Sequence, residues 1–431
     1  MIWNAKTEKM PRNELLRLQS ERLVLQVERM YEKVELFRKR MDEKGLKPSD
    51  IHGVEDLHRL PFSYKQDLRD YYPYGLFARD MKDIVRIHAS SGTTGKKIVV
   101  GYTKNDLKNW SDCVSRLFYA AGADNTSIVQ VSFGYGLFTG GFGVHDAAQN
   151  IGAAVIPISA GNTNNQIQTM IDFGATVLCC TPSYAMYLAE AVNEAGLRDK
   201  LKLKAGIFGA EPWSENMRHA IEEGLNIKAY DVYGLSEIMG PGVAYECEEQ
   251  AGMHICEDMF IPEIIDPETG ENMPDGEEGE LVFTTIAKEG FPLIRYRTRD
   301  ICSLIYEPCA CGRTHIRMRK PNGRSDDMLI IRGVNVFPSQ IEEVLLNIDG
   351  STPNYQIIVD RVNNNDTFDL NVEMSREMFI DDVKSIELLE RKITEKLRST
   401  LGIGVKVHLV NPKTLTRSEG KAKRVIDNRK L

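Results

Sequence analysis

Residues 90–97 read Ser90-Ser91-Gly92-Thr93-Thr94-Gly95-Lys96-Lys97, a run of hydroxyl side chains, glycines and lysines with no apolar residue among them. Apolar stretches at 84–87 and 97–101 flank this run and predict a strand on either side. Glycine lets the backbone approach a ligand closely, hydroxyl and amide groups donate to phosphate oxygens, and lysine supplies positive charge. The run therefore predicts a loop that wraps a polyphosphate, and an ordinary polar turn is the alternative.

The spacing of this loop excludes the usual P-loop. That motif needs four residues between its glycines, a Gly-Lys-Ser/Thr ending and a helix directly afterwards. Here two residues separate Gly92 from Gly95, Lys97 follows Lys96, and a strand is expected next. A P-loop ATPase is therefore the weakest functional alternative.

Length and charge limit the class of protein. The 431 residues exceed one ordinary domain and predict two or more. The formal net charge of −8 argues against a general nucleic-acid binder, which is usually basic. No apolar run approaches the roughly 20 residues of a membrane span, and residues 1–6 lack the apolar core of a signal peptide. We expect a cytoplasmic protein with neither nucleic acid nor a membrane as partner.

The order of apolar segments between 99 and 235 predicts an α/β fold. Near-continuous apolar strands alternate with helical patterns, which indicates mostly parallel sheets layered with helices. The expected strands are 128–133, 153–158, 175–180, 205–208 and 228–232, and the expected helices are 104–121, 138–151, 164–173, 183–195 and 214–223. Short strands and turns from about 240 to 324 predict a β-rich subdomain.

A polar turn, Gly323-Arg324-Ser325-Asp326-Asp327, marks the predicted domain boundary. We expect a large N-terminal domain over residues 1–324 and a small α+β C-terminal domain over residues 325–431.

Four further stretches follow the first loop along the chain. They read Tyr233-Gly234-Leu235-Ser236-Glu237, Tyr296-Arg297-Thr298-Arg299-Asp300, Gly323-Arg324-Ser325-Asp326-Asp327 and Arg417-Ser418-Glu419-Gly420-Lys421. Together with residues 90–97 they resemble the signature motifs of the acyl-adenylate-forming enzymes, the AMP-dependent synthetases and ligases. Residues 132–145, 181–184 and 252–258 resemble the phenylacetate–CoA ligase branch, and the likeness covers nearly the whole chain.

This resemblance implies two half-reactions. A carboxylate attacks the α-phosphate of ATP to give an acyl-adenylate and pyrophosphate, and a thiol then displaces AMP to give a thioester. Because the first step joins two anions, it needs charge neutralisation and alignment. The implied protein is an ATP-dependent acid–CoA ligase that uses ATP, Mg²⁺ and CoA and acts on a small carboxylic acid.

The resemblance assigns most of the nucleotide site to main chain and small side chains. The phosphate loop consists of Ser90, Ser91, Gly92, Thr93, Thr94, Gly95 and Lys96, and further nucleotide-binding residues are Gly209, Ala210, Glu211, Pro212, Asp231, Tyr233 and Gly234. Asp300 is expected to accept both ribose hydroxyls, because a carboxylate only accepts. Arg324 is expected to contact ribose or phosphate.

Three residues are the implied catalytic groups. Ser236 is expected to donate to the α-phosphate, and Glu237 to bind Mg²⁺ through carboxylate oxygens. Lys421 is expected to stabilise the charge that develops during adenylation; a solvated lysine in a basic tail is the alternative. The resemblance further implies that the C-terminal domain is mobile and pivots at Asp326 between the half-reactions.

The glycine-rich stretch 132–145 is the expected acid pocket. Its predicted lining is Tyr135, Gly136, Phe138, Gly141 and Phe142. Aromatic walls favour a flat, apolar acid such as an aryl acetate. The alternative is that these aromatic residues are ordinary core.

Arg299 is the one departure from the family pattern, which has glycine before the ribose aspartate. Because of this departure, the backbone conformation at residue 299 cannot be inferred from the family pattern. The assignment of Asp300 is unaffected.

Cys247, His254, Cys309 and Cys311 predict a structural zinc site, because three thiolates and an imidazole suit zinc. Four protein ligands leave no open position, so the metal would stabilise the β-rich subdomain rather than catalyse. Cys256 and Cys302 are reserve ligands, and four unrelated residues are the alternative.

Two other functions stay open beside the ligase. One is an adenylate-forming enzyme with another acceptor or substrate, such as a coenzyme-nucleotidylating relative. The other is a non-catalytic nucleotide-binding sensor. A homodimer is an expectation from the phenylacetate–CoA ligase branch only.

Overall fold

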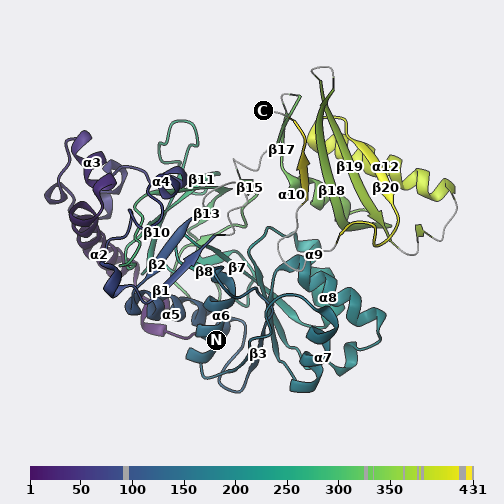
Figure 1. Ribbon diagram of the computed structural model, residues 1–431, viewed down its shortest axis with the longest axis horizontal. Helices are drawn as coiled ribbons and strands as arrows, with labels where there is room; N and C mark the ends of the chain where they lie inside the picture. Colours follow the sequence, from purple (N-terminus) through teal and green to yellow (C-terminus); the bar gives the residue numbers. More distant parts are fainter. Residues whose placement is uncertain are drawn as a thin grey trace. The chain divides into compact units, whose positions relative to one another are not determined.

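The computed structural model describes residues 1–90, 97–324, 329–332, 334–362, 365–375, 378–379, 383–416 and 424–429. These residues form two compact units (Figure 1). The first comprises Met1–Cys180, Lys200–Ala210 and Ile227–Pro321, and the second comprises Thr181–Asp199, Glu211–Asn226 and Asn322–Leu431. None of the described helices combines the length and the apolar composition that crossing a membrane requires.

A mixed sheet, nine-stranded within the described residues, runs through the first unit in the order β13-β14-β9-β8-β7-β6-β5-β3-β4. Its parallel part comprises β3 (Ile128–Val131), β4 (Ala154–Ile156), β5 (Val177–Cys180), β6 (Ala205–Gly209) and β7 (Lys228–Leu235). Its antiparallel part adds β8 (Gly240–Glu246), β9 (Met253–Ile255), β13 (Leu304–Ile305) and β14 (Arg317–Met318). The predicted α/β class is confirmed, and part of the predicted β-rich region extends the same sheet.

The helices of the first unit are α1 (Ala5–Glu8), α2 (Arg12–Lys33), α3 (Glu35–Glu43), α4 (Lys65–Asp70), α5 (Lys104–Ala120), α6 (Thr139–Asn150) and α7 (Thr163–Phe173). Three of them, α5, α6 and α7, match the helices predicted at 104–121, 138–151 and 164–173, and the four others precede them. A capping box starts α5, because Thr103 Oγ1 accepts from the N–H of Asp106 (3.1 Å) and Asp106 accepts from the N–H of Thr103 (2.9 Å). This cap fixes the end of α5 that lies nearest to β2.

Two smaller antiparallel groups complete the first unit. Strands β1 (Arg86–Ala89) and β2 (Val99–Tyr102) form a hairpin, and β10 (Phe260–Ile265), β11 (Gly279–Thr285) and β12 (Tyr296–Cys302) form a second sheet. The predicted phosphate loop therefore joins the two strands of a hairpin.

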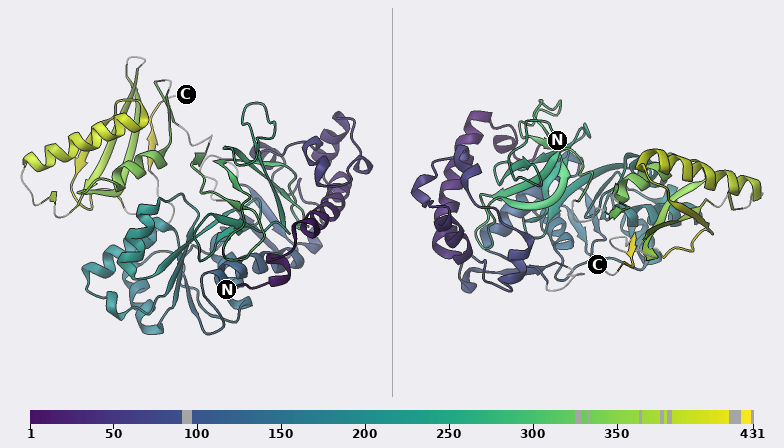
Figure 2. Two further views of the ribbon diagram at one scale, coloured as in Figure 1. Left: turned by 180° about the vertical axis from the view of Figure 1, so that it is seen from behind. Right: turned by 90° about the horizontal axis from the view of Figure 1, so that it is seen from above.

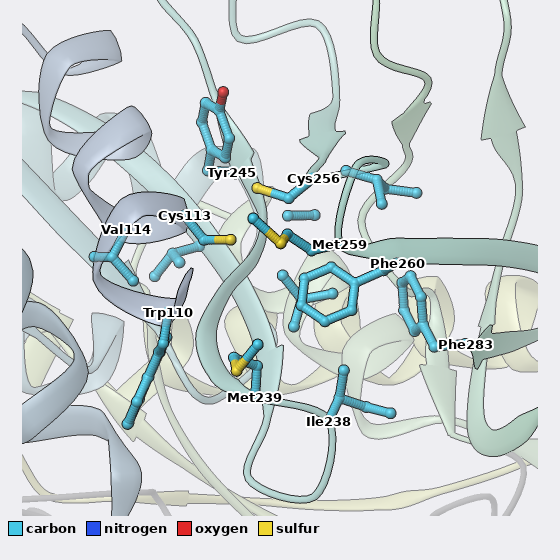
Figure 3. Close-up of a cluster of buried hydrophobic side chains, with 14 of the residues drawn as sticks. Trp110, Cys113, Val114, Ile238, Met239, Tyr245, Cys256, Met259, Phe260 and Phe283 are labelled. Atoms are coloured by element: carbon cyan, nitrogen blue, oxygen red, sulfur yellow. The ribbon is translucent and has the colours of Figure 1, made fainter. Parts of the chain in front are cut away.

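One apolar core joins α5 to both sheets (Figure 3). Trp110 of α5 lies near Met239. Val114 and Ile238 belong to the same core, and all four are almost fully buried. Burial of this apolar surface is the main favourable contribution to folding. Because Ile238 and Met239 directly follow Glu237 in the chain, this core also anchors the segment that carries the predicted magnesium ligand.

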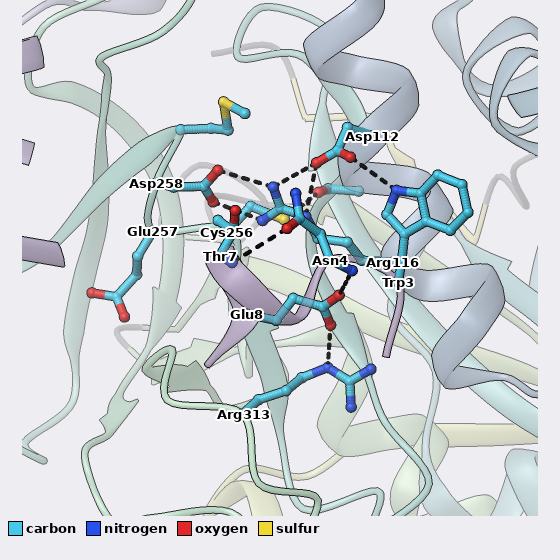
Figure 4. A network of polar contacts seen from close by, with 12 residues as sticks. Trp3, Asn4, Thr7, Glu8, Asp112, Arg116, Cys256, Glu257, Asp258 and Arg313 are labelled. Atoms are coloured by element: carbon cyan, nitrogen blue, oxygen red, sulfur yellow. Dashed lines mark hydrogen bonds and ion pairs between the residues drawn. The ribbon is translucent and has the colours of Figure 1, made fainter. Parts of the chain in front are cut away.

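A buried polar network ties the N-terminus to this unit (Figure 4). Arg116 of α5 donates to both oxygens of Asp258 (2.6 and 2.9 Å) and to Asp112, which also accepts from Trp3 Nε1 (2.9 Å). Glu8 of α1 accepts from Arg313 Nε (2.6 Å). Each buried charge thus has an opposite charge as its hydrogen-bond partner, which offsets the cost of removing it from water.

The second unit contains an α+β arrangement with its own core (Figure 2). Its sheet runs β20-β19-β18-β21, where β18 and β19 are antiparallel and the outer strands pair in parallel. Its elements are α8 (Pro182–Glu194), α9 (Glu215–Leu225), β15 (Gly323–Arg324), β16 (Leu329–Ile331), β17 (Val334–Val336), α10 (Pro338–Leu346), β18 (Ser351–Val362), β19 (Asn365–Met374), α12 (Val383–Leu401), β20 (Lys406–Val410) and β21 (Val425–Asp427). Helices α10 and α12 contact each other, α10 packs on β18, and α12 packs on β20.

Candidate functional site

The candidate nucleotide site lies at the carboxyl ends of the parallel strands, the edge at which open α/β sheets bind ligands. Gly209 ends β6, and a Cβ at this position would lie 2.3 Å from the carbonyl oxygen of Val232, so only glycine fits. Ala210 follows with a positive φ of 73°. Asp231, Tyr233 and Gly234 all belong to β7. The main chain of β6 therefore turns sharply beside the strand that carries the Tyr-Gly-x-Ser-Glu motif.

Ser236 and Glu237 lie in the turn between β7 and β8, and each has a side-chain partner. Ser236 Oγ is 2.9 Å from Thr139 Oγ1, at the start of α6. Glu237 is 8% exposed, and its Oε1 accepts from the hydroxyl of Tyr296 on β12 (2.7 Å). One carboxylate oxygen is thus held in place, and Oε2 is the one suited to a hard cation, which prefers oxygen ligands.

Asp300 lies on β12 and contacts Tyr233, another predicted nucleotide-binding residue. Its Oδ2 accepts from the hydroxyl of Tyr233 at 2.5 Å, and its N–H donates to Thr298 Oγ1 at 3.0 Å. The structure therefore brings Tyr233 and Asp300 together across two sheets. Nearby, Lys320 Nζ lies 3.7 Å from Asp231 Oδ2, which places a positive charge beside the predicted nucleotide residues.

Arg299 adopts the backbone conformation that glycine would favour. Its φ is 70°, in the left-handed region, which explains why the family pattern has glycine at this position. The N–H of Arg299 donates to Glu280 Oε1 (3.2 Å), and its guanidinium lies 3.5 Å from Glu280 Oε2. These contacts with the buried carboxylate of Glu280 stabilise the strained conformation of Arg299. The next residue, Asp300, remains part of strand β12.

The predicted acid pocket contains a half-buried aromatic pair. The rings of Tyr135 and Phe142 meet edge to face at 5.2 Å, and the Tyr135 hydroxyl lies 3.0 Å from His145 Nδ1. A Cβ on Gly141 would lie 2.9 Å from the carbonyl oxygen of Gly134, so glycine lets α6 pack closely here. Gly136 (φ 100°) and Phe138 are exposed. Of the five predicted pocket residues, Gly141 alone is therefore buried, and the three aromatic residues are half-buried or exposed.

Several predicted residues cannot be placed. Ser91, Gly92, Thr93, Thr94, Gly95, Lys96, Asp326 and Lys421 lie outside the described residues. At the base of the phosphate loop, Ser90 and Ile98 bond to each other twice: the N–H of Ser90 donates to the Ile98 carbonyl (2.9 Å), and the N–H of Ile98 to Ser90 Oγ (3.1 Å). Arg324 lies in β15, and its side chain is outside the described part.

Glu211 and Pro212 belong to the second unit. Glu211 Oε1 accepts from the N–H of Ser183 (2.8 Å) and from the Ser183 hydroxyl. This carboxylate therefore caps the first turn of α8, a role that the sequence did not indicate.

A separate candidate metal centre joins β8, β9 and the turn before β14. The ligand atoms of Cys247, His254, Cys309 and Cys311 all lie within 4.8 Å of one another. The Cys247–Cys309 sulfur distance is 3.7 Å, close to the roughly 3.8 Å edge of a zinc–thiolate tetrahedron. Hydrogen bonding, first from Cys247 and then from His254 and Arg313, lowers the pKa of the Cys311 thiol. A thiolate beside an imidazole is a donor set that fits zinc.

The two reserve cysteines lie elsewhere. Cys256 Sγ donates to the carbonyl of Gly242 inside the core shown in Figure 3. Cys302 is buried in β12, and burial raises the pKa of its thiol. Both are core residues. The four cysteine and histidine residues first predicted are the ones whose ligand atoms lie close together.

Tyr296 and Thr139 are site residues that the sequence reasoning passed over. Tyr296 opens the quoted Tyr-x-Thr-x-Asp motif, and Thr139 lies within the glycine-rich stretch 132–145, so a motif-level signal existed for both. Their partners, Glu237 and Ser236, are 59 and 97 residues away along the chain. Only the fold shows these contacts.

Comparison with known proteins identifies the family. The AMP-binding enzyme model matches residues 16–287, and the AMP-binding enzyme C-terminal domain model matches residues 333–429. The chain belongs to the AMP-binding enzyme family. This confirms the resemblance expected from the five motifs.

Individual relatives narrow the branch. A phenylacetate–coenzyme A ligase from Thermus thermophilus is 48% identical over the full length of both chains, and one from Pseudomonas putida is 49% identical over 95% of this chain and 93% of its own. The 2-hydroxyisobutyryl-CoA ligase in its postadenylation state matches with a TM-score of 0.92 at 27% identity, over 98% of this chain and 91% of that one. In its thioesterification state, the same enzyme matches with a TM-score of 0.73 at 28% identity, over 99% of this chain and 92% of that one. The expected phenylacetate–CoA ligase branch is thereby confirmed.

Proposed function

We propose that this chain is an AMP-forming acid–CoA ligase that activates an aryl acid similar to phenylacetate. ATP and the acid give an acyl-adenylate and pyrophosphate, and the thiol of CoA then takes the acyl group and releases AMP. The single observation that carries this proposal is the identity of nearly half of all residues with curated phenylacetate–CoA ligases over 95–100% of this chain. A different acceptor and a non-catalytic sensor are less favoured, because the relatives share the whole chain rather than one domain.

The site residues fit this chemistry. Tyr296 fixes one oxygen of Glu237, so the carboxylate is oriented before it meets a ligand, and Mg²⁺ held there would neutralise phosphate charge. Ser236 is oriented by Thr139 and is available to the α-phosphate. Asp300 is the ribose acceptor, with Tyr233 holding it. Preorganised donors and charges of this kind act mainly by stabilising the charge that develops in the transition state.

The aromatic pair of Tyr135 and Phe142 supports an aryl acid. Its edge-to-face geometry suits a flat apolar group, and Arg86, whose guanidinium carbon lies 5.1 Å from the Phe142 ring centre, is paired with Asp146. The flat ring of phenylacetate matches this aromatic pair.

We further propose that the C-terminal domain pivots at Asp326 and brings Lys421 to the α-phosphate for adenylation only. Two separate hydrophobic cores support the expected boundary between residues 1–324 and 325–431, because one uses residues up to Met318 and the other residues from Leu329 onwards. The relative solved in the postadenylation and thioesterification states gives different TM-scores in those states, as expected of an enzyme that changes shape between half-reactions.

A structural zinc ion held by Cys247, His254, Cys309 and Cys311 is part of the proposal. Its support is the compact ligand set and the buried position of three of the four residues. Arg313, two residues beyond Cys311, pairs with Glu8 of α1, so the metal loop is also tied to the N-terminus (Figure 4). Metal analysis of protein never exposed to chelator should give about one zinc per chain, and less than about half an equivalent would contradict the site.

The remaining expectations are a cytoplasmic location and a homodimer. Light scattering of the purified protein tests the homodimer, and the expected result is twice the chain mass of 48.7 kDa.

Pyrophosphate release with ATP and Mg²⁺ across a panel of carboxylic acids tests the function. We expect release with phenylacetate-like acids, and AMP and thioester only when CoA is added. AMP release that does not require CoA would favour another acceptor, and no release with any acid would revive the sensor.

A further inference from the structure

The turn that carries Ser236 and Glu237 has an unusual set of main-chain partners. The carbonyl of Met239 accepts from the hydroxyl of Tyr102 at 3.0 Å, and the carbonyl of Ser236 lies 3.4 Å from the same hydroxyl and shares its single proton. The carbonyls of Glu237 and Ile238 accept from Nζ of Lys288, at 3.0 and 2.8 Å. Two side chains from other parts of the fold therefore contact four consecutive carbonyl groups, and the contacts to Glu237, Ile238 and Met239 are the short ones.

The two donors are themselves fixed in the core. Tyr102 and Lys288 are completely buried, and Lys288 Nζ lies 5.0 Å from the Tyr102 ring centre, a cation–π arrangement. The Tyr102 ring stacks on Trp110 at 5.1 Å with an interplanar angle of 15°. The indole N–H of Trp110 in turn donates to the carbonyl of Pro241 (2.9 Å), just beyond the turn. The support therefore reaches both ends of the turn.

Asp106 holds the segment that carries Lys288. Its two carboxylate oxygens accept from the N–H groups of Glu289 (2.6 Å) and Gly290 (2.9 Å). Burial lowers the pKa of Lys288 to about 7, while Asp106 and Glu237 favour its charged form. A buried ammonium group is costly unless it is paired and hydrogen-bonded. The bonds from Lys288 to the carbonyls of Glu237 and Ile238 offset part of this cost.

We propose that Lys288 and Tyr102 are positioning residues that hold the turn 236–239, and so aim the Glu237 carboxylate and the Ser236 hydroxyl at the nucleotide. This role rests on the proposed function. Neither side chain reaches the reacting atoms: Lys288 bonds to the main chain of Glu237, not to its carboxylate, and both donors lie within the core. The side chains of Ile238 and Met239 are themselves buried in the core of Figure 3. The turn is thus held by its carbonyls and by its side chains at once.

Two substitutions remove these bonds with little change in shape. Lys288→Met keeps an unbranched apolar stem and leaves the carbonyls of Glu237 and Ile238 without their donor. Tyr102→Phe keeps the stacked ring and removes only the hydroxyl. A misaimed Glu237 binds Mg²⁺ less well, so both variants should need more Mg²⁺ for pyrophosphate release.

The experiment is a Mg²⁺ titration of pyrophosphate release by the full-length protein with ATP and phenylacetate. For Lys288→Met we expect the half-saturating Mg²⁺ concentration to rise about tenfold and the maximal rate to fall at least tenfold, with an unchanged KM for CoA. Tyr102→Phe should raise the half-saturating Mg²⁺ concentration and lower the maximal rate by about threefold each. Leu23→Ala, a fully buried position on α2, is the matched control for lost core stability and should leave the Mg²⁺ requirement unchanged.

The outcomes separate this role from the function itself. An active wild-type protein whose two variants keep the wild-type Mg²⁺ requirement would overturn the positioning role and leave the ligase standing. An equal shift in Leu23→Ala would also overturn it, because the effect would then report stability alone. A wild-type protein that releases no pyrophosphate with any acid would overturn the proposed function and this role with it.

Discussion

Replacing Arg116 by methionine removes the central cation of the network in Figure 4. The Arg116 side chain is 0% exposed and that of Asp258 is 4% exposed, so the substitution leaves a carboxylate buried without its partner. Breaking a buried ion pair by removing one partner costs about 3–5 kcal/mol. We expect a loss of this size in the free energy of unfolding at pH 7. Arg17→Met, at an exposed pair with Glu21, should change it by less than about 0.5 kcal/mol.

The same network predicts the pH dependence of that loss. Burial by itself raises the pKa of Asp258, but the charge and hydrogen bonds of Arg116 outweigh it and lower the pKa to about 2. The unfolded value is about 3.9, so the pair contributes full stability above that pH and loses it as the pH falls towards 2. A pKa of Asp258 lowered this far corresponds to roughly 3 kcal/mol. The difference in the free energy of unfolding between wild type and Arg116→Met should therefore become smaller as the pH falls from 5 to 2.

Urea unfolding followed by tryptophan fluorescence is the assay, because Trp3 belongs to the network and donates to Asp112. The double variant Arg116→Met with Asp258→Asn removes both charges and should recover about 2 kcal/mol relative to the single variant. A loss below about 1 kcal/mol for Arg116→Met, or a gap that does not change with pH, would refute the reasoning.

Three further substitutions test the site. Glu237→Gln keeps the size of the side chain but removes the charge expected to hold Mg²⁺, so pyrophosphate release should fall by about 100-fold or more; a fall below threefold would argue against that role. Gly240→Ala would place a Cβ 2.3 Å from the Trp110 ring at a φ of 105°, so thermal melting should drop by several degrees; an unchanged melting temperature would contradict the packing. Arg299→Gly suits the φ of 70° and loses only the contact between the guanidinium and Glu280, so it should leave adenylation within about threefold of wild type; a larger loss would give Arg299 a direct role with the nucleotide.

The elements that could be predicted from sequence are those whose signal is local. Strand β7 and the motif it carries lie in one continuous stretch, so the apolar run and the Tyr-Gly-x-Ser-Glu pattern located both. The cysteine and histidine spacing likewise selected four residues whose ligand atoms the fold brings together. In both cases residue type alone restricts the chemistry.

The supports of the site could not be predicted in this way. Lys288 and Tyr102 bond to a turn 51 and 134 residues away, and nothing near either residue indicates that contact. Lysine is rarely buried, so sequence reasoning assigns Lys288 to the surface by default. Arg299 was correctly singled out as a departure, but only its positive φ and its contacts with Glu280 show how the backbone accommodates it.

Thioester formation from phenylacetate, ATP and CoA by the purified protein tests the central claim most directly. The account predicts CoA-dependent release of AMP with one phenylacetyl-CoA formed for each pyrophosphate, and no thioester when ATP or Mg²⁺ is left out. Pyrophosphate release without any thioester would contradict CoA as the acceptor. No turnover of phenylacetate or of any other aryl acid would contradict the ligase itself.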